Sequence, residues 1–155
     1  MTESAPEATS DRPEEDVSAG SIFKGILKSM RPHQWVKNLF VLAPLFFSKA
    51  FLIPEQLGRG VAMALLFSLG AGAVYLMNDI FDVEKDRNHP VKKNRPIARG
   101  TLPVSVARIA ALIFGFGSIG IAFWLDTRAG SVLTAYLAMN VAYSMKLKHV
   151  PYIDV

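Results

Sequence analysis

Long apolar runs, separated by short and strongly charged stretches, constrain this chain more than any other feature of its sequence. Of its 155 residues, 51% are hydrophobic, and they gather in these runs rather than at the spacing of a water-soluble core. This arrangement is typical of a chain whose solvent is lipid. The sequence therefore predicts an all-α fold, a multi-pass transmembrane helical bundle.

Four apolar segments are the predicted spans. They cover approximately residues 35–51, 61–78, 103–125 and 131–147. Some are shorter than the roughly 20 residues that cross a bilayer, so we expect their ends to include polar residues at headgroup depth. Small residues in the second and third spans should permit close helix approach; the glycines among them are Gly70, Gly72, Gly115 and Gly117.

The residues before the first span divide into two parts. Residues 1–20 are polar and acidic, which predicts a disordered tail, and residues 21–155 form the transmembrane domain. Residues 21–30 place their apolar side chains on one helical face. They form either a short helix in the membrane interface or the first turns of a longer helix.

The positive charges indicate how the chain lies in the membrane. The net charge is +4, but the Lys and Arg residues cluster at the ends of apolar runs, which favours phosphate groups at a membrane surface over nucleic acid as partners. Lys and Arg residues cluster before the first span, between the second and third spans, and after the fourth span. Because successive spans alternate in direction, these three clusters fall on one side of the predicted bundle. The positive-inside rule then places the N-terminus and the loop after the second span on the cytoplasmic side of the cell membrane.

An acidic helix end follows the second span. Asn78, Asp82 and Asp86 are spaced four apart and would share one helical face, with Asp79 about a quarter-turn aside. Carboxylates this close repel one another unless a cation neutralises them, and hard oxygen ligands suit Mg²⁺. Because Mg²⁺ keeps positions for substrate phosphates, this face predicts a bound diphosphate. The alternative is a solvated acidic helix end without a ligand. However, an acidic group at membrane depth costs free energy, and such groups usually have a functional role.

A basic loop lies downstream. It offers phosphate donors from Lys92, Lys93, Arg95 and Arg99. Metal on one side of a diphosphate and cations on the other would make a sensible pair, whereas the plain alternative is an ordinary positive-inside loop. His89, stiffened by Pro90, is expected to hydrogen-bond within the loop.

Two further polar groups flank the first and fourth spans. Arg31 and Lys37 precede the first, and Gln34 and Asn38, four apart, suggest either substrate contact or a plain membrane anchor. Tyr143 and Lys148 close the fourth span. They are candidate site members, although snorkelling lysines and inter-helix hydrogen bonds explain such residues equally well.

The acidic segment and the basic loop together resemble those of a known family. Asn78-Asp79-x-x-Asp82-x-x-x-Asp86, followed by Arg95-Pro96-Ile97, resembles the UbiA superfamily of intramembrane prenyltransferases. The resemblance implies an all-helical bundle of about nine spans, in which two Asp-rich motifs hold Mg²⁺ and a diphosphate. The segments 31–38 and 86–100 look most like the branch that moves 5-phosphoribose from phosphoribosyl diphosphate to a polyprenyl phosphate, decaprenyl phosphate.

The resemblance also implies roles for residues. Asp79, Asp82 and Asp86 would be the catalytic, Mg²⁺-binding carboxylates, and Asn78 would orient metal or diphosphate. The implied phosphate- and substrate-binding residues are Lys92, Lys93, Arg95, Arg99, Arg31, Gln34, Lys37, Tyr143 and Lys148.

The second Asp-rich motif of the superfamily lies in its later half, beyond the counterpart of Val155. We therefore expect these residues to be a fragment, a truncated gene product or a degenerate copy, with about four spans and half of the metal site. Two alternative functions follow: transfer of an isoprenoid from its diphosphate to an aromatic acceptor, or a non-catalytic membrane protein that binds cations or lipid phosphates.

Overall fold

The computed structural model describes residues 18–145, and every regular element in that range is helical. The all-α prediction is therefore confirmed. The α-helices are α1 (Ala19–Ser29), α2 (Ala43–Phe47), α3 (Pro54–Phe81), α4 (Val83–Arg87), α5 (Pro96–Arg99), α6 (Val104–Leu125) and α7 (Thr127–Met145). Three 3₁₀ segments join them: η1 (Pro32–Leu42), η2 (Ala50–Leu52) and η3 (Lys92–Asn94).

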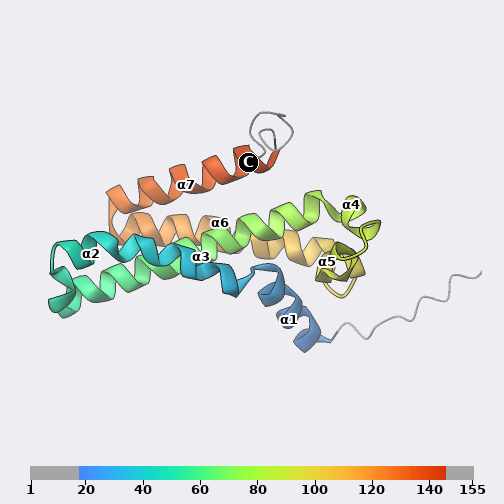
Figure 1. Ribbon diagram of the computed structural model, residues 1–155, viewed down its shortest axis with the longest axis horizontal. Helices are drawn as coiled ribbons and strands as arrows, with labels where there is room; N and C mark the ends of the chain where they lie inside the picture. Colours follow the sequence, from blue (N-terminus) through green and yellow to red (C-terminus); the bar gives the residue numbers. More distant parts are fainter. Residues whose placement is uncertain (1–17, 146–155) are drawn as a thin grey trace, which may run out of the picture.

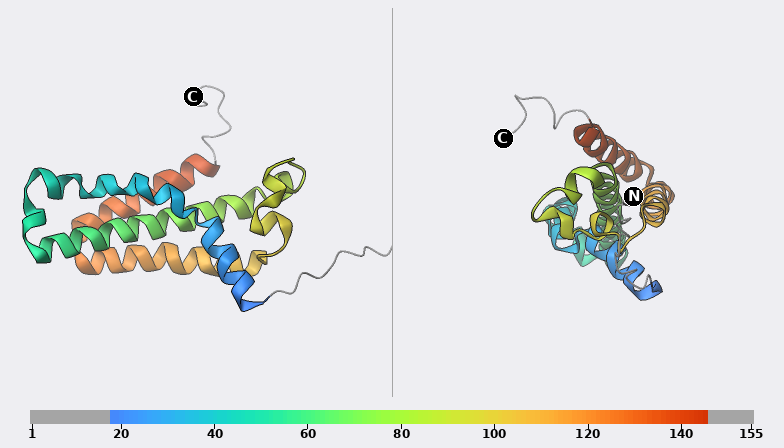
Figure 2. Two further views of the ribbon diagram at one scale, coloured as in Figure 1. Left: turned by 60° about the horizontal axis from the view of Figure 1, so that its bottom comes forward. Right: turned by 90° about the vertical axis from the view of Figure 1, so that its right-hand side faces the viewer.

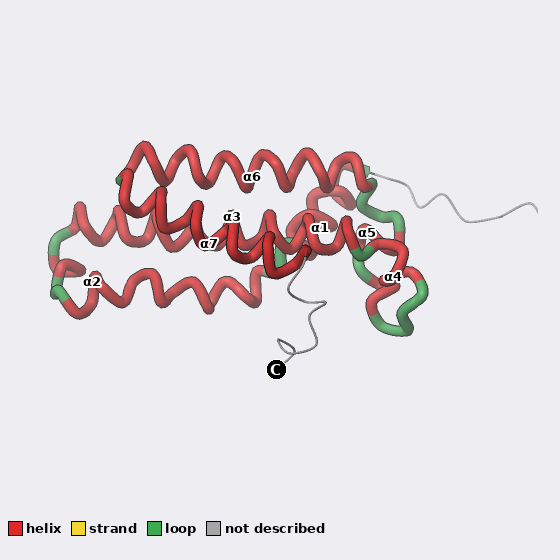
Figure 3. The backbone as a smooth tube through the Cα atoms, turned by 90° about the horizontal axis from the view of Figure 1, so that it is seen from above, coloured by secondary structure: helices red, strands yellow, loops and turns green. Residues whose placement is uncertain are grey.

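The long helix α3 is the centre of the bundle (Figure 1). It packs on α6, on α7 and on the η1–α2 segment. Seen from above, α6 and the η1–α2 segment lie on opposite sides of α3 (Figure 3). The short elements α1, α4 and α5 gather at one end of α3, and the α2–α3 and α6–α7 connections lie at the other (Figure 1).

The helix α1 stands apart from the parallel helices. It crosses them at a steep angle (Figure 2, left) and ends at Ser29, before Arg31 turns the chain with a left-handed φ of 53°. This break supports the short separate helix rather than the first turns of a longer one. Phe23 and Leu27 on α1 are exposed apolar side chains, as expected of a helix at a membrane interface. Residues 1–17 of the predicted tail lie outside the described range, and Ala19 and Gly20 belong to α1.

Small residues allow the close packing around α3. A Cβ on Gly70 would lie 3.0 Å from Leu137 Cδ1, and one on Gly72 would lie 2.7 Å from Met30 Cε. The absence of a side chain at both positions is therefore a packing requirement, as predicted. At Gly115 an added Cβ would meet Ala73 at an ordinary 3.6 Å. The prediction is wrong for Gly117, because nothing lies within 4 Å of a Cβ there.

Two apolar clusters hold the bundle together. The first lies towards α1 and α5 and centres on Met30, Leu76, Ile97, Leu102 and Ala107. The second lies between α3, α6 and α7 and centres on Phe67, Val74, Ala122, Leu133 and Leu137. The first cluster fixes α1 and α5 against α3, so it determines where the chemistry-bearing loops sit.

The first predicted span, 35–51, is not one helix. It is divided into η1, α2 and η2, with Lys49 in a left-handed conformation between the last two. Side chains three apart eclipse in a 3₁₀-helix. Accordingly, Trp35 and Val41 pack on the two apolar clusters and the intervening Asn38 is buried.

Two of the described helices, α3 and α6, are long and apolar enough to cross a membrane. The expected span 61–78 begins earlier, at Pro54, and 103–125 corresponds closely to α6. The fourth, 131–147, corresponds to α7, except that residues 146–147 lie outside the described range. Only 28% of the apolar window of α6 is buried, against 61% for α3. Thus α6 turns an apolar face outward, whereas α3 is enclosed by its neighbours.

Candidate functional site

The polar residues singled out from the sequence gather at the end of α3 where α1, α4 and α5 meet. Backbone geometry explains the gathering. Arg31 turns the chain from α1 into η1, and Pro96 begins the single turn of α5, which Gly100 ends at a φ of 93°. This glycine conformation is one that side-chain-bearing residues rarely adopt.

The acidic segment does not continue α3 as one regular helix. The helix α3 ends at Phe81, Asp82 is the junction, and α4 begins at Val83. Helical spacing nevertheless persists, because the amide of Asp82 donates to Asn78 O at 3.0 Å and that of Asp86 donates to Asp82 O at 2.8 Å.

The buried carboxylates are Asp79 and Asp86, each 2% exposed. Seven residues are close to two helical turns, which brings these two side chains to the same side. Asp82 is only half-buried. Asn78, Asp82 and Asp86 keep the helical spacing of the predicted face, and Arg95 in addition joins Asp86 to Asp79, which the sequence had placed aside.

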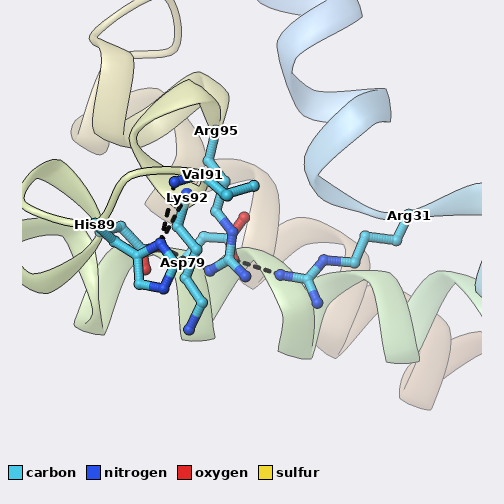
Figure 4. Close-up of polar contacts among 7 residues, drawn as sticks. Arg31, Asp79, His89, Val91, Lys92 and Arg95 are labelled. Atoms are coloured by element: carbon cyan, nitrogen blue, oxygen red, sulfur yellow. Dashed lines mark hydrogen bonds and ion pairs between the residues drawn. The ribbon is translucent and has the colours of Figure 1, made fainter.

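Two arginines join these carboxylates into an ion network (Figure 4). Arg31 Nη2 donates to Asp79 Oδ1 at 2.7 Å. Arg95 Nη1 donates to Asp79 Oδ1 at 3.1 Å and to Asp86 Oδ2 at 2.6 Å. Buried carboxylates need such partners because an unpaired buried charge is very costly. The guanidinium of Arg31 also lies over the Tyr75 ring, 4.8 Å from its centre.

A cavity of about 610 Å³ adjoins the ion network. Nine of its twelve lining residues carry polar or charged side chains, and four of these are the cations Lys28, Arg31, Lys92 and Arg95. Asp79 is the only acidic residue among the twelve. This basic cavity therefore suits an anionic ligand.

A second cavity, of about 220 Å³, lies between α3 and α7. Asn78, Tyr136, Asn140 and Tyr143 are among the residues that line it. Asn140 Nδ2 donates to Tyr136 O at 2.7 Å, so its amide serves the helix itself. Tyr75 belongs to this cavity and also contacts Arg31, which connects the two regions.

The predicted site residues thus separate into groups. Arg31, Gln34, Lys92 and Arg95 line the basic cavity beside Asp79, whereas Asn78 and Tyr143 line the second cavity. Three predicted cations are exposed and line neither of these two cavities: Lys37, Lys93 and Arg99. Lys148 lies outside the described residues.

Gln34 and Asn38 lie in different surroundings. Residues four apart point in different directions in a 3₁₀-helix. Gln34 lines the basic cavity, whereas Asn38 Nδ2 donates to Ser68 Oγ on α3 at 3.2 Å.

His89 behaves as predicted. Its Nδ1 accepts from the backbone amides of Val91 and Lys92, each at 3.2 Å (Figure 4). The loop is therefore shaped around this imidazole.

Sequence reasoning missed four polar lining residues of the basic cavity: Lys28, Ser29, His33 and Asn94. Lys28 and Ser29 end α1, and His33 follows Arg31 closely. Their closeness in sequence to Arg31 was the one available indication.

The donor set fits a divalent metal in its chemistry, although no group of three or more His, Cys, Asp or Glu side chains is assembled for one among residues 18–145. Asp79 and Asp86 are hard oxygen donors, and they already share one cationic nitrogen, Arg95 Nη1. Two carboxylates that share a cationic centre in this way suit Mg²⁺, which uses one or two protein carboxylates.

Comparisons with known proteins identify the family of this chain. The model of the UbiA prenyltransferase family matches residues 39–155. Decaprenyl-phosphate phosphoribosyltransferase of Mycobacterium tuberculosis is 40% identical over 87% of this chain, and that of Corynebacterium glutamicum is 42% identical over 84%. Digeranylgeranylglyceryl phosphate synthase of Pyrococcus abyssi is 34% identical over 84%.

The aligned region covers only 46%, 41% and 46% of these three relatives, so the chain spans about half of their length. Within that length, the apolar helices, the acidic segment and the basic loop occur together in one bundle. The chain belongs to the UbiA prenyltransferase family of membrane-embedded transferases.

Proposed function

We propose that the protein is a Mg²⁺-dependent membrane transferase that moves 5-phosphoribose from phosphoribosyl diphosphate to decaprenyl phosphate. One observation carries the proposal: a basic cavity lies directly beside the buried carboxylate pair Asp79 and Asp86. A sugar that carries both a phosphate and a diphosphate needs many cationic and polar contacts, and this cavity offers them. The names of the mycobacterial and corynebacterial relatives support decaprenyl phosphate as the acceptor and phosphoribose as the transferred group.

Arg31 and Arg95 change partners in the proposed binding step. In the structure they neutralise Asp79 and Asp86. Asp79, Asp82 and Asp86 would hold Mg²⁺. The guanidinium groups of Arg31 and Arg95 would donate to phosphate oxygens, for which their forked geometry is well suited. Lys92 lines the same cavity and adds a further cation. We assign Lys93 and Arg99 to the entry of the charged donor from the aqueous side.

The remaining predicted residues have supporting roles. Gln34 would orient the ribose in the cavity, and Lys37 would meet the acceptor phosphate near the membrane surface. Asn78 would orient diphosphate from the second cavity, with Tyr143 opposite it. Lys148 would contribute a further cation from beyond α7.

The reaction is a substitution at ribose C1. The bond between C1 and the diphosphate oxygen breaks as an acceptor phosphate oxygen forms the new C1–O bond, and diphosphate leaves with the electron pair. Bound Mg²⁺ would stabilise negative charge that develops on the leaving diphosphate. The cationic side chains of the cavity supply the same kind of stabilisation, and no protein nucleophile is required.

The membrane arrangement follows from the charges. The cations of α1, α4, η3 and α5 gather at one end of the bundle, and Lys49, Arg59 and Arg128 lie towards the other. We propose that the crowded end and the N-terminus face the cytoplasm. The water-soluble donor would enter there, and the lipid acceptor would enter from the bilayer.

The test uses purified protein in lipid nanodiscs. Phosphoribosyl diphosphate with a labelled ribose, decaprenyl phosphate and Mg²⁺ should give a labelled lipid that partitions into organic solvent. EDTA and the variant Asp82→Ala should each abolish its formation, whereas Glu55→Ala, an exposed carboxylate at the opposite end of α3, should not. Unchanged turnover of Asp82→Ala would exclude a metal role for that carboxylate.

Prenyl transfer is the second candidate, and the relative from Pyrococcus abyssi favours it. In this case the donor would be an isoprenoid diphosphate, and the acceptor an aromatic acid or another small molecule. The same nanodiscs supplied with geranylgeranyl diphosphate separate the two functions. Prenylation of an acceptor in the absence of any phosphoribosyl lipid would overturn the proposal.

A further inference from the structure

Ser29 presents a buried polar atom without a partner. The residue is 2% exposed, and its hydroxyl Oγ makes no hydrogen bond. Among residues 18–145 it is the one buried side-chain polar atom in this condition. Most buried polar side-chain atoms are paired, so each exception needs a physical reason.

The missing bond is one that serines in helices commonly make. A helical serine can donate to the carbonyl four residues earlier. In this protein, Ser68 donates to Ala64 O at 2.8 Å, and Ser131 donates to Thr127 O at 2.9 Å. Ser29 has the carbonyl of Gly25 in the corresponding place and makes no such bond. Its hydroxyl is therefore left for another acceptor.

The surroundings of Ser29 define what that acceptor is. Ser29 lines the basic cavity together with Lys28, which precedes it in sequence, and Arg31, which follows Met30. Lys92 and Arg95 of the basic loop line the same cavity. The four cations that line this cavity with Ser29 favour an anionic acceptor.

The cations nearest the acidic segment are already engaged, since Arg31 and Arg95 both donate to Asp79. A phosphate that enters the cavity must compete with this carboxylate for the arginines. It meets no such competition for the hydroxyl of Ser29, which donates to nothing else among the described residues.

We propose that Ser29 is a phosphate-binding residue, and that its Oγ–H donates to a phosphate oxygen of a substrate held in the basic cavity. The inference rests on the proposed function only in placing a substrate phosphate there. The phosphate can be that of the soluble donor or that of the lipid acceptor, because α1 lies at the edge where both would arrive.

The test compares Ser29→Ala with Ser21→Ala in nanodiscs. Ser21 lies on the same helix, but its hydroxyl donates to Ser18 O and it does not line the cavity. Affinity is measured for phosphoribosyl diphosphate with Mg²⁺, for inorganic diphosphate with Mg²⁺, and for decaprenyl phosphate. Since a hydrogen bond to a charged group is lost, Ser29→Ala should weaken binding of one phosphate source about tenfold, and Ser21→Ala should not.

Thermal unfolding without ligand supplies the second readout. Removal of an unpaired buried hydroxyl should leave the midpoint of Ser29→Ala unchanged or raise it, because no bond is lost and alanine favours the helix. A lowered midpoint would show that the hydroxyl has a structural partner and would overturn the proposal. The proposal would fall equally if no phosphate source bound more weakly.

The results also separate the two proposals. Weaker binding to the soluble probes alone assigns Ser29 to the donor, and weaker binding to decaprenyl phosphate alone assigns it to the acceptor. Phosphoribosyl transfer with unchanged affinities in Ser29→Ala would refute only the role of Ser29. Weakened affinities without any phosphoribosyl transfer by the wild type would instead refute the proposed function.

Discussion

Arg31 and Asp79 are 48 residues apart in sequence and form an ion pair of 2.7 Å between Nη2 and Oδ1. The pair joins the turn after α1 to the last turns of α3. Asp79 is almost fully buried, whereas the guanidinium of Arg31 remains partly open to the basic cavity. The same bond therefore holds two segments together and keeps a cation at the edge of the proposed binding site.

Asp79→Asn should destabilise the protein strongly. The amide cannot neutralise Arg31 and Arg95, and breaking a buried charge network by removing one partner costs about 3 kcal/mol or more. Thermal unfolding in nanodiscs measures the effect. The matched control is Glu55→Gln, which breaks the exposed pair with Arg59 and should cost less than about 1 kcal/mol. Equal losses in the two variants would contradict the importance of the buried network.

Arg95→Lys and Arg95→Met should separate charge from geometry. Arg95 Nη1 contacts both Asp79 and Asp86. In our proposal, the remaining N–H groups of the guanidinium donate to phosphate oxygens. Lysine keeps the charge but lacks the forked donor set, so affinity for inorganic diphosphate with Mg²⁺ should fall about tenfold. Methionine should lower it about a hundredfold. Calorimetric titration checks both values, and equal affinities for Arg95→Lys and the wild type would argue against donation from more than one nitrogen.

Gly72→Ala should disturb the site through packing alone. A Cβ at position 72 would lie 2.7 Å from Met30 Cε and 3.0 Å from Met30 Cβ, so the side chain of Met30, which precedes Arg31, must move. Overpacking of this kind costs about 1–3 kcal/mol. Gly117→Ala is the control, because its Cβ would meet nothing within 4 Å and a helical alanine gains about 0.5–1 kcal/mol over glycine. Unfolding midpoints that move in opposite directions are the expected outcome, and a tolerated alanine at position 72 would refute the close contact.

Asn38 and Ser68 should show energetic coupling. Asn38 Nδ2 donates to Ser68 Oγ across the interface between η1 and α3. A double-mutant cycle with Asn38→Ala and Ser68→Ala should give about 0.6 kcal/mol, with about 1.7 kcal/mol as the upper bound for hydrogen bonds between membrane helices. Additive losses would mean that the bond contributes nothing. Ser48→Ala with Asn38→Ala provides an uncoupled pair, because Ser48 donates only within its own turn.

The long helices could be predicted because hydropathy specifies them directly. The apolar runs within α3 and α6 are long enough to cross a membrane as helices. The 3₁₀ conformation of η1 could not be predicted in the same way. Its inward-packing residues Trp35, Asn38 and Val41 recur every three positions, but the polar Asn38 does not read as buried from the sequence. Its burial is explained only by the hydrogen bond to Ser68 on α3.

The sequence indicated many of the residues that gather at the candidate site, but not which of their side chains contact one another. The spacing of the carboxylates identified the acidic segment, yet local periodicity favoured Asn78, Asp82 and Asp86 over the observed pair of Asp79 and Asp86. That pair depends on Arg95, which approaches from α5, and on Arg31, which approaches from α1. Ser29 was missed for a similar reason, because an unpaired hydroxyl becomes visible only when its neighbours in space are known.

The 3₁₀ conformation of η1 also lengthens its reach. A residue rises about 2.0 Å in a 3₁₀-helix and about 1.5 Å in an α-helix. The eleven residues of Pro32–Leu42 therefore extend about 22 Å along α3, where an α-helix of the same length would extend about 16 Å. A segment of eleven residues can in this way run beside about half of α3, whose 28 residues extend about 42 Å (Figure 1). A single-residue deletion within η1 would shorten this segment by about 2.0 Å, which is more than the loss of about 1.5 Å from the same deletion in α6.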